Sequence, residues 1–202
     1  MSKEQLYIFD TTLRDGAQTQ GVDFSIDDKE KISSVLDKLG VDYVEGGWPG
    51  ANPTDTEFFN KDHNFKSTKL TAFGMTKKSE HSAENDPMLS SLINSKSTSV
   101  CLFGKSWDFQ VDVALGISNE QNLMNISEST KHIVKSGKEF MFDAEHFFDG
   151  YKANPEYAMS CLKAAFDNGA RWIVLCDTNG GTLPVSYTHL TLPTILLVYI
   201  SV

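Results

Sequence analysis

Short apolar runs alternate with longer amphipathic stretches along most of this 202-residue chain. Each apolar run is four or five residues long, which suits a buried strand better than a helix. The runs are 6–10, 41–45, 70–73, 99–103, 140–144 and 172–176. The expected helices between them cover about 25–39, 54–59, 86–94, 119–135 and 154–169. Repeated strand-then-helix units predict a parallel sheet in an α/β fold.

The first of these helices carries start and stop signals in its sequence. Ser25 is a good N-cap residue, and Asp28 follows it at the capping-box position. Gly40 comes directly after the last apolar position and can adopt the left-handed conformation that ends many helices. We therefore expect the helix to run between these residues.

Two architectures are compatible with this alternation, an open doubly wound sheet and a closed (β/α)8 barrel. An open sheet that binds a nucleotide usually has a glycine-rich turn after its first strand. Residues 11–16 read TTLRDG, which is not a G-x-G-x-x-G turn. Polar residues of catalytic type also follow nearly every expected strand, as they do in barrels.

The stretch from Phe9 to Gln18 reads FDTTLRDGAQ; it begins at the end of the first expected strand and continues into the loop after it. It resembles the signature of the acyl-CoA-dependent Claisen-condensing family, which comprises the 2-isopropylmalate, homocitrate and citramalate synthases, with 3-hydroxy-3-methylglutaryl-CoA lyase as a relative. The resemblance selects the barrel. Because a complete barrel has about eight βα units, the six units found here imply an incomplete (β/α)8 TIM barrel.

The resemblance also assigns roles within this loop. In the family's reaction a thioester methyl group loses a proton, and the carbanion attacks the keto carbon of a 2-oxo acid bound to a divalent metal ion, Mn²⁺, Mg²⁺ or Zn²⁺. Asp15 matches a metal ligand, since hard cations favour carboxylate oxygen. Arg14 matches the residue placed against the keto oxygen. Gln18 matches a substrate-binding position, with loop support as the alternative.

Three further segments resemble the citramalate synthase branch of the family: 47–50 (GWPG), 103–108 (FGKSWD) and 142–150 (FDAEHFFDG). By this match Glu145 is the catalytic carboxylate that assists proton transfer. His146 is either a second participant or a structural histidine in an aromatic patch.

Glu45 ends the second expected strand, where family members often carry an active-site carboxylate. The alternative is a solvated glutamate at the end of a strand. We therefore expect Glu45 to be either a catalytic residue or a surface residue.

Residues 176–184, CDTNGGTLP, follow the last expected strand and match the same branch. Thr178 matches the residue whose hydroxyl binds the carboxylate of the 2-oxo acid. Asp177 and Asn179 are expected to build the loop, because both residue types bond to nearby backbone and tolerate tight turns. The family completes its metal site with a His-x-His pair on the seventh strand. This sequence has no such pair, and its five histidines are isolated, at 63, 81, 132, 146 and 189.

Composition excludes some classes of function and indicates a compartment. A formal net charge of −9 argues against a nucleic-acid partner, which would need clustered positive charge. No stretch is long enough to span a membrane, and the N-terminus lacks an apolar leader segment, so a cytoplasmic protein is expected. The three cysteines, Cys101, Cys161 and Cys176, are expected to be reduced thiols.

The character of the sequence changes after Pro184. Residues 185–194, VSYTHLTLPT, resemble the in-frame translation of a transposase adapter used in sequencing libraries. We therefore expect 1–184 to be the N-terminal part of a catalytic barrel and 185–202 to be a non-native tail; a divergent apolar C-terminus is the alternative. Without two strands of the barrel, the segments 6–10 and 172–176 are expected to be unpaired edges.

The resemblance implies an acyltransferase that joins acetyl-CoA, its co-substrate, to pyruvate and releases (R)-citramalate and CoA in isoleucine biosynthesis. A homodimeric parent enzyme is also expected. The alternatives are a 2-isopropylmalate or homocitrate synthase and, from another class, a non-catalytic truncated fragment. The chain of 202 residues is itself expected to be inactive.

Overall fold

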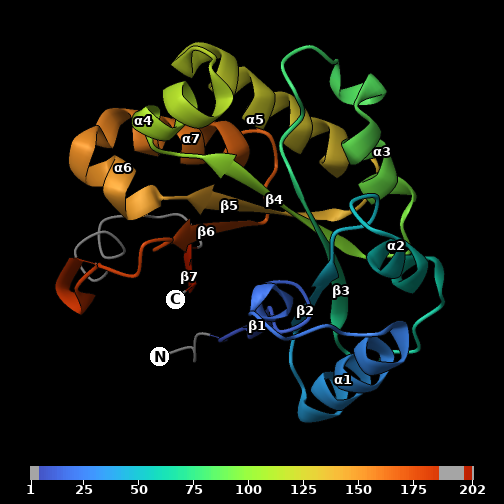
Figure 1. Ribbon diagram of the computed structural model, residues 1–202. Coiled ribbons are helices and arrows are strands. Elements are labelled where there is room, and N and C mark those ends of the chain that lie inside the picture. The colour runs from blue at the N-terminus through green and yellow to red at the C-terminus, as the bar shows by residue number, and fades with distance from the viewer. Residues whose placement is uncertain (1–4, 187–197, 202) are drawn as a thin grey trace. The chain divides into compact units, whose positions relative to one another are not determined.

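The computed structural model describes residues 5–186 and 198–201. Most of the predicted tail, namely 187–197 and 202, lies outside the described residues. The chain divides into two compact units, one formed by the residues up to Gly74 together with 90–100, the other by 75–89 and the residues from Cys101 onward. Figure 1 labels the helices and strands of both.

The first unit contains three consecutive parallel strands, β1 (Phe9–Asp10), β2 (Tyr43–Gly47) and β3 (Lys69–Met75). Asp10 pairs with Val44 in the first pair, and Glu45 pairs with Thr71 in the second. The beginning of β4 (Ser99–Lys105) continues this order, because the Thr98 N–H donates to the Leu70 carbonyl at 3.0 Å.

Helices α1 (Ile26–Leu39) and α2 (Pro53–Asn60) follow β1 and β2, and α3 (Pro87–Asn94) precedes β4. The predicted ends of α1 are confirmed. Ser25 and Asp28 form a capping box, and Gly40 has a φ of 81° in the left-handed region. The apolar face of α1 packs on a buried cluster of the first unit that includes Leu13 and Val44. This packing fixes the loop that follows β1.

The second unit contains the rest of β4 followed by β5 (Glu139–Glu145), β6 (Trp172–Cys176) and β7 (Val198–Ser201), in that order. Strands β5, β6 and β7 are parallel, and Ile173 pairs with Val198. The sequence did not predict β7, and the prediction that residues 172–176 form an unpaired edge is wrong, since β7 pairs with them.

The helices of the second unit are α4 (Asp108–Gln110), the π-helical turn η3 (Val111–Leu115), α5 (Asn119–Lys135), α6 (Phe147–Ala153) and α7 (Pro155–Phe166). Two 3-10 turns, η1 (Gly16–Gln18) and η2 (Ala83–Asn85), complete the short elements of the chain. Helices α5 and α7 pack on each other and on β5 (Figure 1). Within the described ranges, no helix has both the length and the apolar character that crossing a membrane requires.

The first strand is shorter than predicted, and helix α6 was not predicted. The first strand was expected over 6–10, but β1 covers only Phe9 and Asp10. Leu6 and Ile8 are 89% and 59% exposed, so these apolar residues are not part of a buried strand. Helix α6 was not predicted: its residues, two buried phenylalanines among them, lie between the expected strand 140–144 and the expected helix 154–169, where no element was assigned.

Candidate active site

The loop after β1 is a tight turn built around one carbonyl group. The carbonyl of Thr11 accepts hydrogen bonds from the N–H groups of residues 14, 15 and 16, at 3.1, 2.8 and 3.2 Å. Leu13, at the centre of the turn, is fully buried. The turn therefore fixes where Arg14 and Asp15 leave the backbone.

Arg14 binds two of the predicted site carboxylates. Its Nε donates to Glu45 Oε2, and its Nη1 donates to Asp15 Oδ1 at 3.0 Å. The guanidinium carbon lies 3.9 Å from the centre of the Phe73 ring, a cation–π arrangement. The structure thus brings Arg14, Asp15 and Glu45 together within the first unit, as the sequence predicted for a site at the carboxyl ends of the strands.

The burial of Glu45 decides between its two interpretations. Its side chain has no solvent exposure, so the alternative of a solvated glutamate is wrong. A buried carboxylate is retained at such a place only with a close cationic partner, here Arg14. Glu45 therefore holds the guanidinium in one orientation.

Arg14 and Gln18 line the same cavity. Its volume is about 410 Å³, and Trp48, Asn52 and Phe73 also line it. The cavity thus combines charged side chains of both signs with two amides and aromatic faces, and Arg14 offers it a cation that suits a small carboxylic acid. Gln18, at the end of η1, is placed where it could bind a substrate.

Asp15 fits one ligand of a divalent metal ion. Its side chain is 62% exposed, and the described contacts occupy only one of its carboxylate oxygens. In the part of the chain that the structure describes, no group of three metal-ligating side chains includes Asp15. Asp15 would therefore need further ligands, such as water or substrate oxygens, to hold the ion.

Glu145 ends β5 in the second unit and has a cationic neighbour that the sequence analysis did not single out. Lys105 Nζ lies 2.6 Å from Glu145 Oε2. That oxygen is buried and accepts no aligned hydrogen bond in the described structure, so the contact is an ion pair. Ser106 fixes the backbone of Glu145, since its hydroxyl and its N–H donate to the Glu145 carbonyl at 2.7 and 3.2 Å. Only the position of Lys105 in the matched 103–108 segment could have indicated it.

His146 occupies an unusual backbone conformation. Its φ is 55°, and it is the only non-glycine residue with a positive φ among the described residues. Its N–H donates to Thr178 Oγ1 at 2.9 Å. Its ring lies against Trp107, with 5.9 Å between centroids, and its buried Nδ1 is 3.8 Å from Asp149 Oδ2 without a hydrogen bond. Both interpretations of this histidine remain compatible with that environment.

In the loop after β6, Asp177 bonds to nearby backbone as predicted, whereas Asn179 bonds to a side chain of α6. Asp177 accepts hydrogen bonds from the N–H and the hydroxyl of Thr182, each at 2.9 Å. Asn179 Nδ2 donates to Asp149 Oδ2 at 2.7 Å. Asp177 therefore closes the loop that carries Thr178, and Asn179 fastens this loop to α6.

A buried thiol–carboxylate pair between β4 and β5 was also not predicted. Cys101 Sγ donates to Asp143 Oδ1 at 3.0 Å, and both residues are buried. None of the three cysteines forms a disulfide within the described residues. Burial raises the pKa of Cys161 to about 12.

Comparisons with known proteins show what the chain is similar to. Residues 5–192 match the model of the HMGL-like family. The chain is 52% identical to an (R)-citramalate synthase of Aquifex aeolicus, over 93% of this chain and 36% of the relative. It is 48% identical to an (R)-citramalate synthase of Sulfolobus acidocaldarius, over 95% of this chain and 37% of the relative. A 2-isopropylmalate synthase of Caldanaerobacter subterraneus is 30% identical, over 94% of this chain and 46% of the relative. The chain thus spans little more than a third of the citramalate synthases that it matches.

Among solved structures, the HMG-CoA lyase of Bacillus subtilis superimposes with a TM-score of 0.77 at 16% identity, over 97% of this chain and 67% of the lyase. At this identity the likeness concerns the fold alone. Together with consecutive parallel strands joined by helices, it confirms an incomplete (β/α)8 barrel.

Proposed function

Because the chain belongs to the HMGL-like family, we propose that the protein containing it condenses acetyl-CoA with pyruvate to give (R)-citramalate and CoA. One observation carries the proposal. The five (R)-citramalate synthases compared with the chain are 44–52% identical to it, whereas the 2-isopropylmalate synthases are 27–30% identical.

The residues of the first unit suit recognition of the 2-oxo acid. Arg14 carries a fixed positive charge into the cavity, and that charge would stabilise the alkoxide that forms on the keto oxygen. The buried Glu45 orients the guanidinium. Gln18 supplies an amide on the same cavity wall. We propose that Asp15 holds the divalent metal ion, which when bound supplies Lewis-acid polarisation of the keto group.

The residues of the second unit suit proton transfer and carboxylate binding. We propose that Glu145 takes a proton from the methyl group of acetyl-CoA, after which the methyl carbon forms a bond to the keto carbon. Hydrolysis of the thioester then releases CoA. Thr178 accepts a hydrogen bond from the His146 N–H, so its own O–H remains available to donate to the pyruvate carboxylate.

The wider assignments are also proposals. The product would feed branched-chain amino-acid synthesis, toward isoleucine. Three free cysteines suit a reducing compartment, and we propose the cytoplasm. We further propose that the full-length protein is a homodimer, which light scattering of the purified protein would test.

The experiment is a product analysis of the full-length protein. It is incubated with ¹³C-methyl-labelled acetyl-CoA, pyruvate and Mn²⁺ or Mg²⁺, and the products are identified by NMR. We expect labelled citramalate and one free CoA for each molecule formed. The chain of residues 1–202 alone should give neither, because no group of three metal-ligating side chains among the described residues includes Asp15. Absence of citramalate from the full-length reaction would contradict the proposal.

A further inference from the structure

Lys29 is a buried lysine in the first turn of α1, with only 3% of its surface exposed. Its Nζ donates to the Leu13 carbonyl at 3.0 Å, to the Gly46 carbonyl at 2.8 Å and to the Asp55 carboxylate. An ammonium group has three N–H donors, so these three acceptors use all of them. A charge buried this deeply is tolerated because every donor is satisfied and an anion is present.

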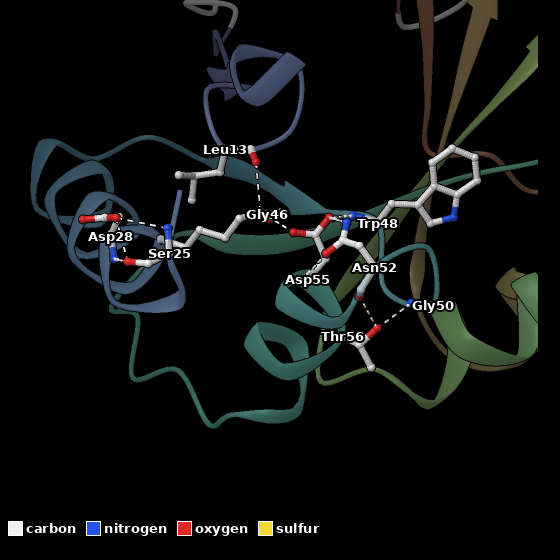
Figure 2. A network of polar contacts seen from close by, with 10 residues as sticks. Leu13, Ser25, Asp28, Gly46, Trp48, Gly50, Asn52, Asp55 and Thr56 are labelled. Carbon is white, nitrogen blue, oxygen red and sulfur yellow. Dashed lines mark hydrogen bonds and ion pairs between the residues drawn. The ribbon is translucent and has the colours of Figure 1, made fainter. Parts of the chain in front are cut away.

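Asp55 extends the network to the start of α2. Its Oδ2 accepts hydrogen bonds from the Trp48 N–H at 2.8 Å and from Asn52 Nδ2 at 2.9 Å, and its own N–H donates to Asn52 Oδ1 (Figure 2). Gly47 permits this close approach. It has a φ of 137°, and a Cβ at this position would lie 2.5 Å from the carboxylate of Asp55.

The two carbonyls that Lys29 binds lie next to the Arg14–Glu45 pair. Leu13 directly precedes Arg14 in the loop after β1, and Gly46 directly follows Glu45 at the end of β2. One ammonium group therefore ties together the two backbone segments that carry the guanidinium and the carboxylate. Lys29 itself lies at the wall of the cavity that Arg14 and Gln18 line.

We propose that Lys29 is a positioning residue that sets the geometry of Arg14 and Glu45 for binding the 2-oxo acid. This inference rests on the proposed function for its catalytic consequence. Lys29 does not touch the substrate. It acts by holding the carbonyls of Leu13 and Gly46 at a fixed separation, and Asp55 neutralises its charge.

The test separates positioning from simple structural support. Lys29→Met alone leaves Asp55 as a buried unpaired carboxylate and is expected to destabilise the fold. The informative variant is therefore the double substitution Lys29→Met with Asp55→Asn, which removes both charges. The matched control is Lys31→Met with Asp27→Asn. It removes another lysine–aspartate ion pair, which is exposed and lies wholly on α1, the helix that carries Lys29. All variants are made in the full-length protein.

Two readouts are compared with the wild type. The first is amide hydrogen exchange, which should rise about tenfold or more at residues 14–16 and 47–48 in the Lys29/Asp55 variant and stay unchanged in α5. The second is steady-state kinetics, in which the KM for the 2-oxo acid should rise about tenfold while the KM for acetyl-CoA changes less than about twofold. The Lys31/Asp27 control should match the wild type in both.

Unchanged exchange in the Lys29/Asp55 variant would overturn the proposal. An equal rise in both KM values, with faster exchange throughout the protein, would also overturn it and leave only a structural role. If the wild type releases no CoA with any 2-oxo acid, the proposed function fails. The exchange measurement then still decides whether Lys29 fixes the two segments.

Discussion

The hydroxyl oxygen of Thr178 accepts a hydrogen bond from the backbone N–H of His146 at 2.9 Å. The bond joins the loop after β6 to the residue that follows Glu145. It also orients the hydroxyl, because the O–H bond must point away from the N–H that donates to the oxygen. The O–H of Thr178 is therefore available as a donor to another group, as the proposed binding of a substrate carboxylate requires.

Thr178→Val in the full-length protein should weaken binding of the 2-oxo acid selectively. Loss of one hydrogen bond to a charged group is worth about 1.5–3 kcal/mol, which corresponds to a ten- to hundredfold rise in its KM. Thr178→Ser retains the hydroxyl and should stay close to the wild type. Steady-state kinetics with each substrate varied in turn measures this. Equal damage to the KM of acetyl-CoA would instead mean that the loop has lost its structure.

Glu45→Gln should lower both stability and activity, because it removes the buried anionic partner of Arg14 and leaves only the exposed Asp15 as its counter-ion. Breaking a buried ion pair costs about 3 kcal/mol or more in the free energy of unfolding. Urea denaturation of the full-length protein measures the loss. The double variant Arg14→Met with Glu45→Gln should lose less than the sum of the two single losses. Strict additivity would show that the two residues do not interact.

Stability in acid should depend on Asp37, whose carboxylate accepts hydrogen bonds from three backbone N–H groups, those of residues 66, 67 and 68. These bonds lower its pKa to about 2 from an ordinary value of 3.8. Because the folded pKa is the lower one, the stabilisation is complete above about pH 4 and is lost as the pH falls toward 2.

The corresponding measurement is the difference in melting temperature between the wild type and Asp37→Asn from pH 2 to pH 6. The wild type should be the more stable above pH 4, and the difference should shrink as the pH approaches 2. A difference that does not vary with pH would contradict the role given to these hydrogen bonds.

Thiol reactivity should differ among the three cysteines of the native protein. Cys101 and Cys161 are fully buried, whereas Cys176 is half-buried. Burial also raises the pKa of Cys161 to about 12, so almost none of it is thiolate at pH 8. Labelling with a maleimide followed by mass spectrometry should modify Cys176 first. Modification of Cys161 at the same rate would contradict its burial.

The local features of the fold were predictable from the sequence, and the contacts between distant segments were not. Ser25, Asp28 and Gly40 define the ends of α1 through short-range rules, and the structure confirms them. The sequence does not reveal that Lys29 is buried, because a lysine on an amphipathic helix usually faces water. Its burial depends on a carbonyl 17 residues away and a carboxylate 26 residues away.

In the candidate site, too, local motifs were predictable and contacts between distant segments were not. The motif resemblance predicted roles for Arg14, Asp15, Glu145 and Thr178, and these roles stay predictions. The burial of Glu45 was undecided in the sequence because its partner Arg14 lies on another segment. The ion pair between Lys105 and Glu145 likewise joins the ends of two strands, which no local pattern indicates.

The central claim concerns which 2-oxo acid the protein accepts. The most direct measurement is the kcat/KM of the full-length protein for pyruvate, 2-oxoisovalerate and 2-oxoglutarate, followed by release of CoA at saturating acetyl-CoA. We predict the highest kcat/KM for pyruvate, by at least about tenfold. A higher kcat/KM for either of the larger acids would contradict the proposal of a citramalate-forming enzyme.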